Sequence, residues 1–367
     1  MPTFGHICYG LALLIPILYY TKTDEKPFNY KVAFIFLTNN IYGPDLVGLF
    51  FVIPTHNILG FLIMALPLAV FFSYFSRFSL KKSEGKFPLK FVDDGISEVN
   101  YKNAFCITAA GGISHFFIDQ FYHWEKKMQI WPGIAITHDE MLAWGGPAYH
   151  YITPLIILGD IAIVSYIVLS LYTFMKGHKE TFKLLLISTL VTLSLMVFIS
   201  TSIFWAEREI GAIVHCFVYV LIPLFLLMYA ARDVKDNPIT TPDIPKINRK
   251  TLLKIVVIIS ILFALFMAFY AYFAITYAGY LAELIIEMFG GNVAEMTITV
   301  TIIGYIYMTF AIILLIASIG LFFKSNICRY IVMTICTYFL IFVFPFAITL
   351  FLCERDVKAM FGKESEV

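Results

Sequence analysis

Long apolar blocks dominate this chain, and they limit the folds available to it more than any other feature. A transmembrane helix needs about 20 consecutive, mainly apolar residues. Blocks of that length occur near 4–20, 57–79, 103–122, 151–175, 182–204, 210–230, 251–279, 297–323 and 328–352, and a shorter one lies at 31–43. The sequence therefore predicts an all-α fold, a polytopic transmembrane helical bundle of about ten membrane segments, one of them short or half-spanning.

Composition and motifs narrow the class of protein further. Of the 367 residues, 60% are hydrophobic and 14% are charged, whereas soluble domains carry about 25% charged residues. The first apolar run has no basic leader, so we expect a retained helix and not a cleaved signal peptide. The six cysteines form no C-x-x-C pair, which argues against a thiolate zinc site. Membrane lipid is the expected partner; no nucleic-acid motif is present.

The basic residues predict a topology. If every segment crosses the membrane, 20 of the 26 Lys and Arg residues fall on one side and 6 on the other. Cytoplasmic loops carry the excess of Lys and Arg, so the first side is predicted to be cytoplasmic, with both chain ends outside. All four tryptophans then lie on the outer side, where the headgroup region favours them. We expect a multi-pass protein of the plasma membrane.

Potential metal ligands gather on the predicted outer face. Three of them recur every fourth residue in GGISHFFIDQFYH (residues 111–123), and residues four apart point the same way from a helix. The others lie near the outer ends of the preceding segments. The full set is His6, Asp45, His56, His115, Asp119 and His123. Imidazole and carboxylate suit zinc or a similar divalent ion, one or two per site, and coordination would offset the cost of charge in a membrane.

Each of these residues also has a structural interpretation. His115 and Asp119 would equally form a hydrogen-bonded pair between helices, Asp45 would cap a short helix, and His6 would lie at the membrane interface. His123 continues the stripe, yet it also stands beside Trp124 at the predicted headgroup level. We favour the metal interpretation because the candidate ligands share one predicted membrane face. That face is assigned from the Lys and Arg residues alone, so the agreement is independent of the ligands.

Short motifs around these residues resemble a known family, the YdjM-like membrane-bound metal-dependent hydrolases, which are remote relatives of zinc-dependent phospholipase C. The motifs are GH at 5–6, PD at 44–45, TH at 55–56, SHFFID at 114–119 and WPG at 131–133. The resemblance covers roughly residues 1–135. It implies that His6, Asp45, His56, His115 and Asp119 bind metal and that the substrate is a phosphoester.

Two departures from the family pattern leave the substrate and the activity open. Members often carry a second carboxylate soon after PD, where this chain has Leu46, Val47 and Gly48. They also often carry His-Arg before TH, where this chain has Val52, Ile53 and Pro54. The missing arginine is the expected clamp for a phosphate group.

The outer loops offer further candidates. Glu140 and His150 are candidates for the catalytic general base, although the stretch THDEMLAWGGPAYH around them is also typical of a solvated loop. Arg208 is a candidate for binding an anionic substrate group, with an interfacial anchor as the alternative. The acidic stretch 280–296 predicts an amphipathic surface helix that ends at Gly290 and Gly291.

These observations predict two regions. Residues 1–150 form a metal-site helical core, and residues 151–367 add transmembrane helices of unassigned role. The predicted function is a membrane-embedded hydrolase in which metal-activated water attacks a (phospho)ester, with lipid as a possible substrate, at the outer face. The alternatives are an ion- or proton-coupled transporter, in which Asp160 joins His115 and Asp119, and an inactive membrane scaffold.

Overall fold

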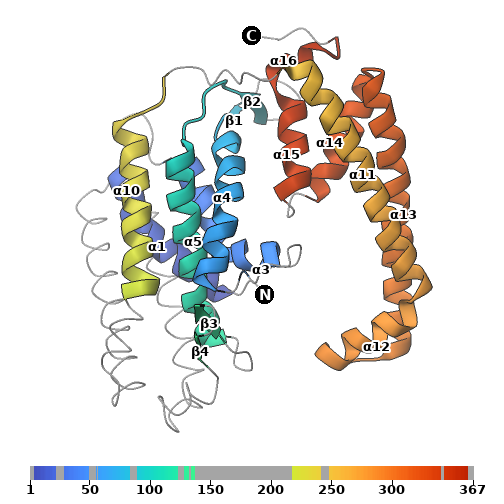
Figure 1. Ribbon diagram of the computed structural model, residues 1–367, viewed down its shortest axis with the longest axis horizontal. Coiled ribbons are helices and arrows are strands. Elements are labelled where there is room, and N and C mark those ends of the chain that lie inside the picture. The colour runs from blue at the N-terminus through green and yellow to red at the C-terminus, as the bar shows by residue number, and fades with distance from the viewer. Residues whose placement is uncertain are drawn as a thin grey trace. The chain divides into compact units, whose positions relative to one another are not determined.

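The computed structural model describes two compact units of a mostly helical chain (Figure 1). The described residues are 4–21, 29–48, 55, 57–82, 89–122, 128–131, 134–136, 217–240, 248–339 and 343–362. Unit 1 comprises Met1–Ser76 and Ile96–Thr241, and unit 2 comprises Arg77–Gly95 and Pro242–Val367. The predicted segments 151–175 and 182–204, and the predicted region boundary at residue 150, lie outside the described residues.

Unit 1 is arranged around one central helix. Its described elements are α1 (Phe4–Thr21), α2 (Tyr30–Ile41), α3 (Gly43–Gly48), α4 (Ile58–Phe75), α5 (Tyr101–Tyr122), the hairpin β3 (Met128–Trp131) and β4 (Ile134–Ile136), the π-turn η2 (Phe217–Leu221) and α10 (Ile222–Asp236). Helix α5 packs against α1, α2, α3, α4 and α10 (Figure 1). Side chains from α5 therefore enter the interior among several neighbours.

Small residues let the helices of unit 1 approach closely. A Cβ on Gly111 of α5 would lie 2.7 Å from the Asn39 side chain of α2, and one on Gly112 would lie 1.9 Å from the Phe61 ring of α4. Glycine at helix contacts lets backbones meet in this way. The two glycines thus set how deeply α5 is seated between α2 and α4.

Helix α2 confirms the short segment predicted at 31–43. Asn29 begins the helix by accepting hydrogen bonds from the backbone N–H groups of Lys31 and Val32. Its 12 residues extend about 18 Å, which is shorter than the ~30 Å hydrocarbon core. The chain then turns at Tyr42 and starts α3, so the polar end of α2 stops inside unit 1, where Asn39 and Asn40 are buried.

Unit 2 consists of long helices and one hairpin. Its described elements are β1 (Phe78–Lys82), β2 (Leu89–Asp93), α11 (Arg249–Thr276), α12 (Ala278–Phe289), α13 (Val293–Phe322), α14 (Asn326–Tyr338), α15 (Val343–Cys353) and α16 (Arg355–Ala359). The strands are antiparallel, with Phe78 opposite Asp93. Helices α11 and α13 pack along each other, closely enough that a Cβ on Gly304 would lie 2.7 Å from Ile275.

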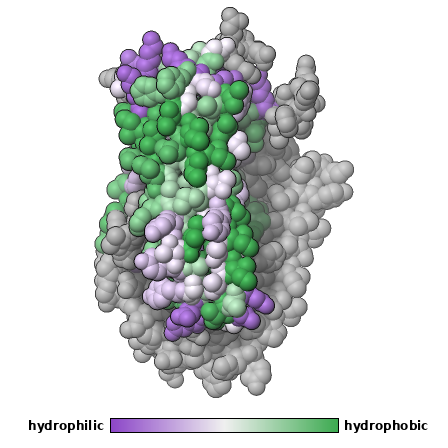
Figure 2. Space-filling model, turned by 90° about the vertical axis from the view of Figure 1, so that its right-hand side faces the viewer, coloured by the Kyte–Doolittle hydropathy of each residue, from purple (hydrophilic) through white to green (hydrophobic). Residues whose placement is uncertain are grey.

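Three helices among the described residues are long and apolar enough to cross a membrane: α4, α11 and α13. They match the predicted segments 57–79, 251–279 and 297–323. On the face of unit 2 that Figure 2 shows, apolar residues cover a broad area and hydrophilic residues gather at the two ends. The predicted surface helix at 280–296 corresponds to α12, which ends at Gly290 with φ 76°.

The predicted single span at 328–352 is instead two short antiparallel helices. Helix α14 has 13 residues and α15 has 11, so neither reaches across ~30 Å of hydrocarbon. Arg329, early in α14, donates to the carbonyl of Leu352, late in α15, at 2.9 Å, and Thr349 donates to the carbonyl of Met333 at 3.3 Å. Glu354 therefore returns to the end of unit 2 at which α13 finishes and α14 begins.

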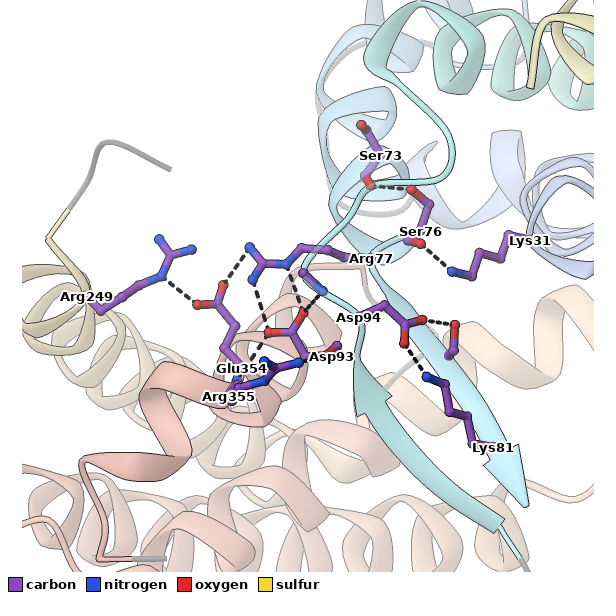
Figure 3. A network of polar contacts seen from close by, with 12 residues as sticks. Lys31, Ser73, Ser76, Arg77, Lys81, Asp93, Asp94, Arg249, Glu354 and Arg355 are labelled. Carbon is purple, nitrogen blue, oxygen red and sulfur yellow. Dashed lines mark hydrogen bonds and ion pairs between the residues drawn. The ribbon is translucent and has the colours of Figure 1, made fainter. Parts of the chain in front are cut away.

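Ion pairs at this end hold the hairpin to the helices of unit 2 (Figure 3). Arg77 binds Asp93 through two hydrogen bonds of 3.0 Å and lies 3.8 Å from Glu354. Glu354 also pairs with Arg249 at 2.6 Å, and the backbone N–H of Arg355 donates to Asp93 at 3.2 Å. Asp93 and Glu354 are buried, and the neighbouring arginines balance their charges. This pairing offsets the cost of removing the carboxylates from water. The start of α11 and the end of α15 thus meet around one polar cluster.

Candidate functional site

Three of the predicted ligands meet in the interior of unit 1. His6 comes from α1, Asp45 from the first turn of α3 and His115 from α5. The two imidazole rings lie 4.2 Å apart between centroids, and His115 Nε2 is 4.0 Å from Asp45 Oδ1. Both histidines are fully buried and the Asp45 side chain is 17% exposed. These residues are distant in sequence, so the fold itself brings them together.

A backbone contact assigns one ring proton of His115 to Nδ1. Its Nδ1 lies 2.8 Å from the carbonyl oxygen of Asn40. A carbonyl only accepts hydrogen bonds, so we assign the proton to Nδ1, which leaves a lone pair on Nε2 of the neutral ring. Histidine ligands of metal ions commonly donate a hydrogen bond from their second ring N–H to a backbone carbonyl in this way.

The Nε2 atom of His115 and the Asp45 carboxylate are both acceptors in this state. Their 4.0 Å separation is longer than a hydrogen bond. A positive charge is required between the two groups to attract both of them. A divalent metal ion meets this requirement, and so does a proton on Nε2, which would convert the contact into an ion pair.

Thr55 is hydrogen-bonded to the residue that precedes Asp45. The Thr55 hydroxyl donates to the carbonyl of Pro44 at 2.7 Å, and Thr55 is buried. Thr55 directly precedes His56, and Pro44 directly precedes Asp45. Thr55 and Pro44, which belong to motifs chosen separately from the sequence, are therefore neighbours in space.

Sequence reasoning missed a second polar layer beside the histidines. The Asn40 amide donates to the Ser114 hydroxyl at 2.8 Å, which donates to the carbonyl of Gly111 at 2.8 Å. Asn40 and Ser114 are fully buried. Gly10 makes room for this layer, because a Cβ there would lie 2.3 Å from Asn40 Oδ1. The signal in the sequence was the pair of asparagines in a short apolar segment.

The described side chains do not by themselves complete a metal site. Among them, no group of three or more His, Cys, Asp and Glu residues has an arrangement that could hold a metal ion. The backbone of Asp119 lies in α5, four residues after His115, but its side chain lies outside the described ones. The donor chemistry of His6, Asp45 and His115 fits zinc, and the remaining ligands stay predictions.

The other predicted site residues also lie outside the described residues. They are the ligand candidates His56 and His123, the general-base candidates Glu140 and His150, the anion-binding candidate Arg208 and the transporter candidate Asp160. Their assigned roles stay predictions from the sequence.

Comparison with protein-family models, with curated proteins and with solved structures finds no match to this chain. The resemblance to the YdjM-like family therefore rests on the short motifs alone.

Proposed function

We propose that this protein is a membrane-embedded, metal-dependent hydrolase that cleaves a (phospho)ester, with membrane lipid as the substrate class. The observation that carries the proposal is the meeting of His6, Asp45 and His115 in the interior of unit 1. A catalytic zinc site commonly combines three protein ligands, often imidazole and carboxylate, with a position left open for water. The apolar helices α4, α11 and α13 support a membrane location.

In this proposal the protein supplies a preorganised set of donors. His6 and His115 would contribute imidazole nitrogens and Asp45 a carboxylate, with His56, Asp119 and His123 as the additional ligands. The Asn40 carbonyl would keep the Nδ1 proton of His115 in place, so that Nε2, which faces Asp45, would be the nitrogen that binds the ion. A bound zinc ion would lower the pKa of its water ligand toward ~7.

The roles of Glu140, His150 and Arg208, which lie outside the described residues, are proposed from the sequence alone. Glu140 or His150 would accept the proton of the attacking water, and Arg208 would bind the anionic part of the substrate. The excess of Lys and Arg on the opposite side supports a site on the extracytoplasmic face of a multi-pass protein.

Metal analysis of the full-length protein tests the proposal. Wild-type protein should carry one or two zinc ions per chain after purification without chelators, while His115→Ala and Asp45→Asn should each retain less than a tenth of that amount. Thr108→Val is the matched control, because Thr108 is also fully buried in α5 but lies two turns before His115. Equal metal content in all four proteins would contradict the proposal.

A proton- or ion-coupled transporter is the second candidate, and two observations favour it. A proton joins His115 and Asp45 as well as a metal ion does. Helices α14 and α15 are too short to span the membrane, and discontinuous helices are common at transporter sites. Absence of bound metal, together with pH-dependent flux into proteoliposomes that Asp45→Asn abolishes, would favour this function. Absence of both activities would favour a scaffold.

A further inference from the structure

The two ends of unit 2 carry exposed charges of opposite sign. At the end where α11 begins and α13 finishes, the exposed basic residues among those described are Lys81, Lys90, Lys250, Lys254, Lys324 and Arg355. The exposed carboxylate at this end among the described residues is Asp356. At the other end, the described residues of α12 and the start of α13 carry Glu283, Glu287 and Glu295 and no Lys or Arg. The basic end is therefore suited to an anionic surface.

The hairpin β1–β2 extends this basic end. Its base is buried, since Phe78 is 1% and Asp93 is 5% exposed, and Asp93 belongs to the polar cluster around Arg77. Two residues further along β1 the strand is open to its surroundings, with Leu80 56% exposed and the side chain of Lys81 58% exposed. A two-stranded ribbon is barely stable alone. The buried base therefore holds in place an outer half that adds little to the core of unit 2.

Two lysines face each other on one side of this outer half. The register places Lys81 directly opposite Lys90, and both are exposed. Residues directly opposite in a ribbon have Cβ atoms about 4.5–5.5 Å apart, where like charges destabilise the pairing. Lys81 has an ion pair with Asp94 at 2.7 Å, whereas Lys90 has no ionic partner among the described residues. An external anion beside Lys90 would relieve the repulsion.

The base of the hairpin lies at the border of the apolar region. Arg249, the first residue of α11, pairs with Glu354, which lies 3.8 Å from Arg77, the residue before β1. Figure 1 shows both strands at this end of unit 2, near α16. Helix α11 is apolar enough to cross a membrane, so its charged start marks the membrane surface. In the predicted topology this surface is cytoplasmic, where the leaflet carries anionic lipids.

We propose that the β1–β2 hairpin docks on the anionic surface of the cytoplasmic leaflet, with lipid phosphate groups at Lys90 and beside it at Lys81. An exposed ammonium attracts phosphate as a point charge, and a lysine near an anionic leaflet strengthens binding about fivefold. The docked hairpin would hold the basic end of unit 2 against the headgroups. The proposal does not depend on the hydrolase function, because it concerns residues of unit 2 only.

The alternative is that these lysines only direct membrane insertion and do not bind lipid. Lys90→Glu separates the two, because it reverses the charge without removing an ion pair to a described residue. The new carboxylate stands opposite Lys81, and opposite charges across a ribbon stabilise the pairing. The variant hairpin should therefore fold at least as well as wild type while being repelled by anionic lipid. The control is Glu287→Lys, a charge reversal at an exposed position of the acidic end.

The measurement is hydrogen exchange of the backbone amides of residues 78–92 in the full-length protein. It is made in nanodiscs of phosphatidylcholine and in nanodiscs of equal amounts of phosphatidylcholine and phosphatidylglycerol. Wild type and Glu287→Lys should exchange about fivefold more slowly in the mixed lipid. Lys90→Glu should exchange equally in both lipids, and no faster than wild type in phosphatidylcholine. Equal exchange of wild type in the two lipids, or an unchanged slowing in Lys90→Glu, overturns the proposal.

Discussion

The two units place their polar side chains in opposite ways. In unit 1 His6, Asn40 and His115 are fully buried in the interior. In unit 2 the buried charged residues Arg77, Asp93, Arg329 and Glu354 lie at one end, and the interior behind them is mainly an apolar cluster that extends from Leu253 to Phe361. Polar groups deep in a membrane protein are costly and usually serve function. The comparison therefore predicts that unit 1 carries the chemistry and that the charges of unit 2 mainly hold the fold.

The largest expected effect concerns topology, and it sharpens the account of unit 2. Since α14 and α15 are antiparallel, residue 359 should face the same side of the membrane as residue 81, and Glu283 on α12 should face the opposite side. Cysteines introduced at Ala359, Lys81 and Glu283, all exposed positions, can be labelled in sealed vesicles with an impermeant maleimide above the wild-type background. Labelling of Ala359→Cys together with Glu283→Cys, and not with Lys81→Cys, would break the hairpin assignment.

Removal of a buried carboxylate from the polar end of unit 2 should strongly destabilise the fold. Glu354→Gln leaves Arg249 and Arg77 facing each other without their shared anion, a change that typically costs about 3–5 kcal/mol. Thermal unfolding in detergent measures the loss, and metal content per folded chain should not change. Asp236→Asn, which breaks an exposed pair with Arg232, is the control and should cost less than about 1 kcal/mol. Similar unfolding of both variants would show that the cluster does not hold unit 2 together.

A smaller loss is expected where helices of unit 1 touch. Gly112→Ala drives a Cβ into the buried Phe61 ring, and such overpacking costs about 1–3 kcal/mol. The matched substitution in unit 2 is Gly279→Ala, in a helix with open space around it, which should be neutral or stabilising by up to about 1 kcal/mol. The shift of the thermal unfolding midpoint of each variant from that of wild type measures these changes in stability. A Gly112→Ala protein as stable as wild type would mean that α4 and α5 are not packed as described.

The smallest expected effect tests whether one buried hydroxyl of α5 contributes to stability or to metal binding. Thr108 is fully buried in α5, and its hydroxyl has no hydrogen-bond partner among the described atoms. Thr108→Val keeps the shape and removes that hydroxyl, so stability should stay the same or rise by about 1 kcal/mol. A clear loss of stability or of bound metal would show that this hydroxyl serves the site.

The sequence predicted the long apolar helices and the convergence of His6, Asp45 and His115, because apolar runs and charge sidedness are encoded locally. It failed at 328–352, where α14 ends at Tyr338 and α15 begins at Val343 within one apolar run. The only local sign was Pro345, which lies in the first turn of α15, where proline is tolerated. The contact between His115 and the Asn40 carbonyl also could not be predicted, because it depends on how α5 packs against α2 and not on the sequence pattern of either helix.

The hairpin β1–β2 imposes an order on how this protein is completed. It is synthesised with the helices of unit 1. Its Asp93 can accept the hydrogen bond from the backbone of Arg355 only after Arg355 has been synthesised, 262 residues further along the chain. At ribosomal rates of about 5–20 residues per second, that interval is on the order of tens of seconds. A chain that stops early therefore leaves Arg77 and Asp93 without Glu354 and Arg355, and no cut in the middle of the gene separates the two units cleanly.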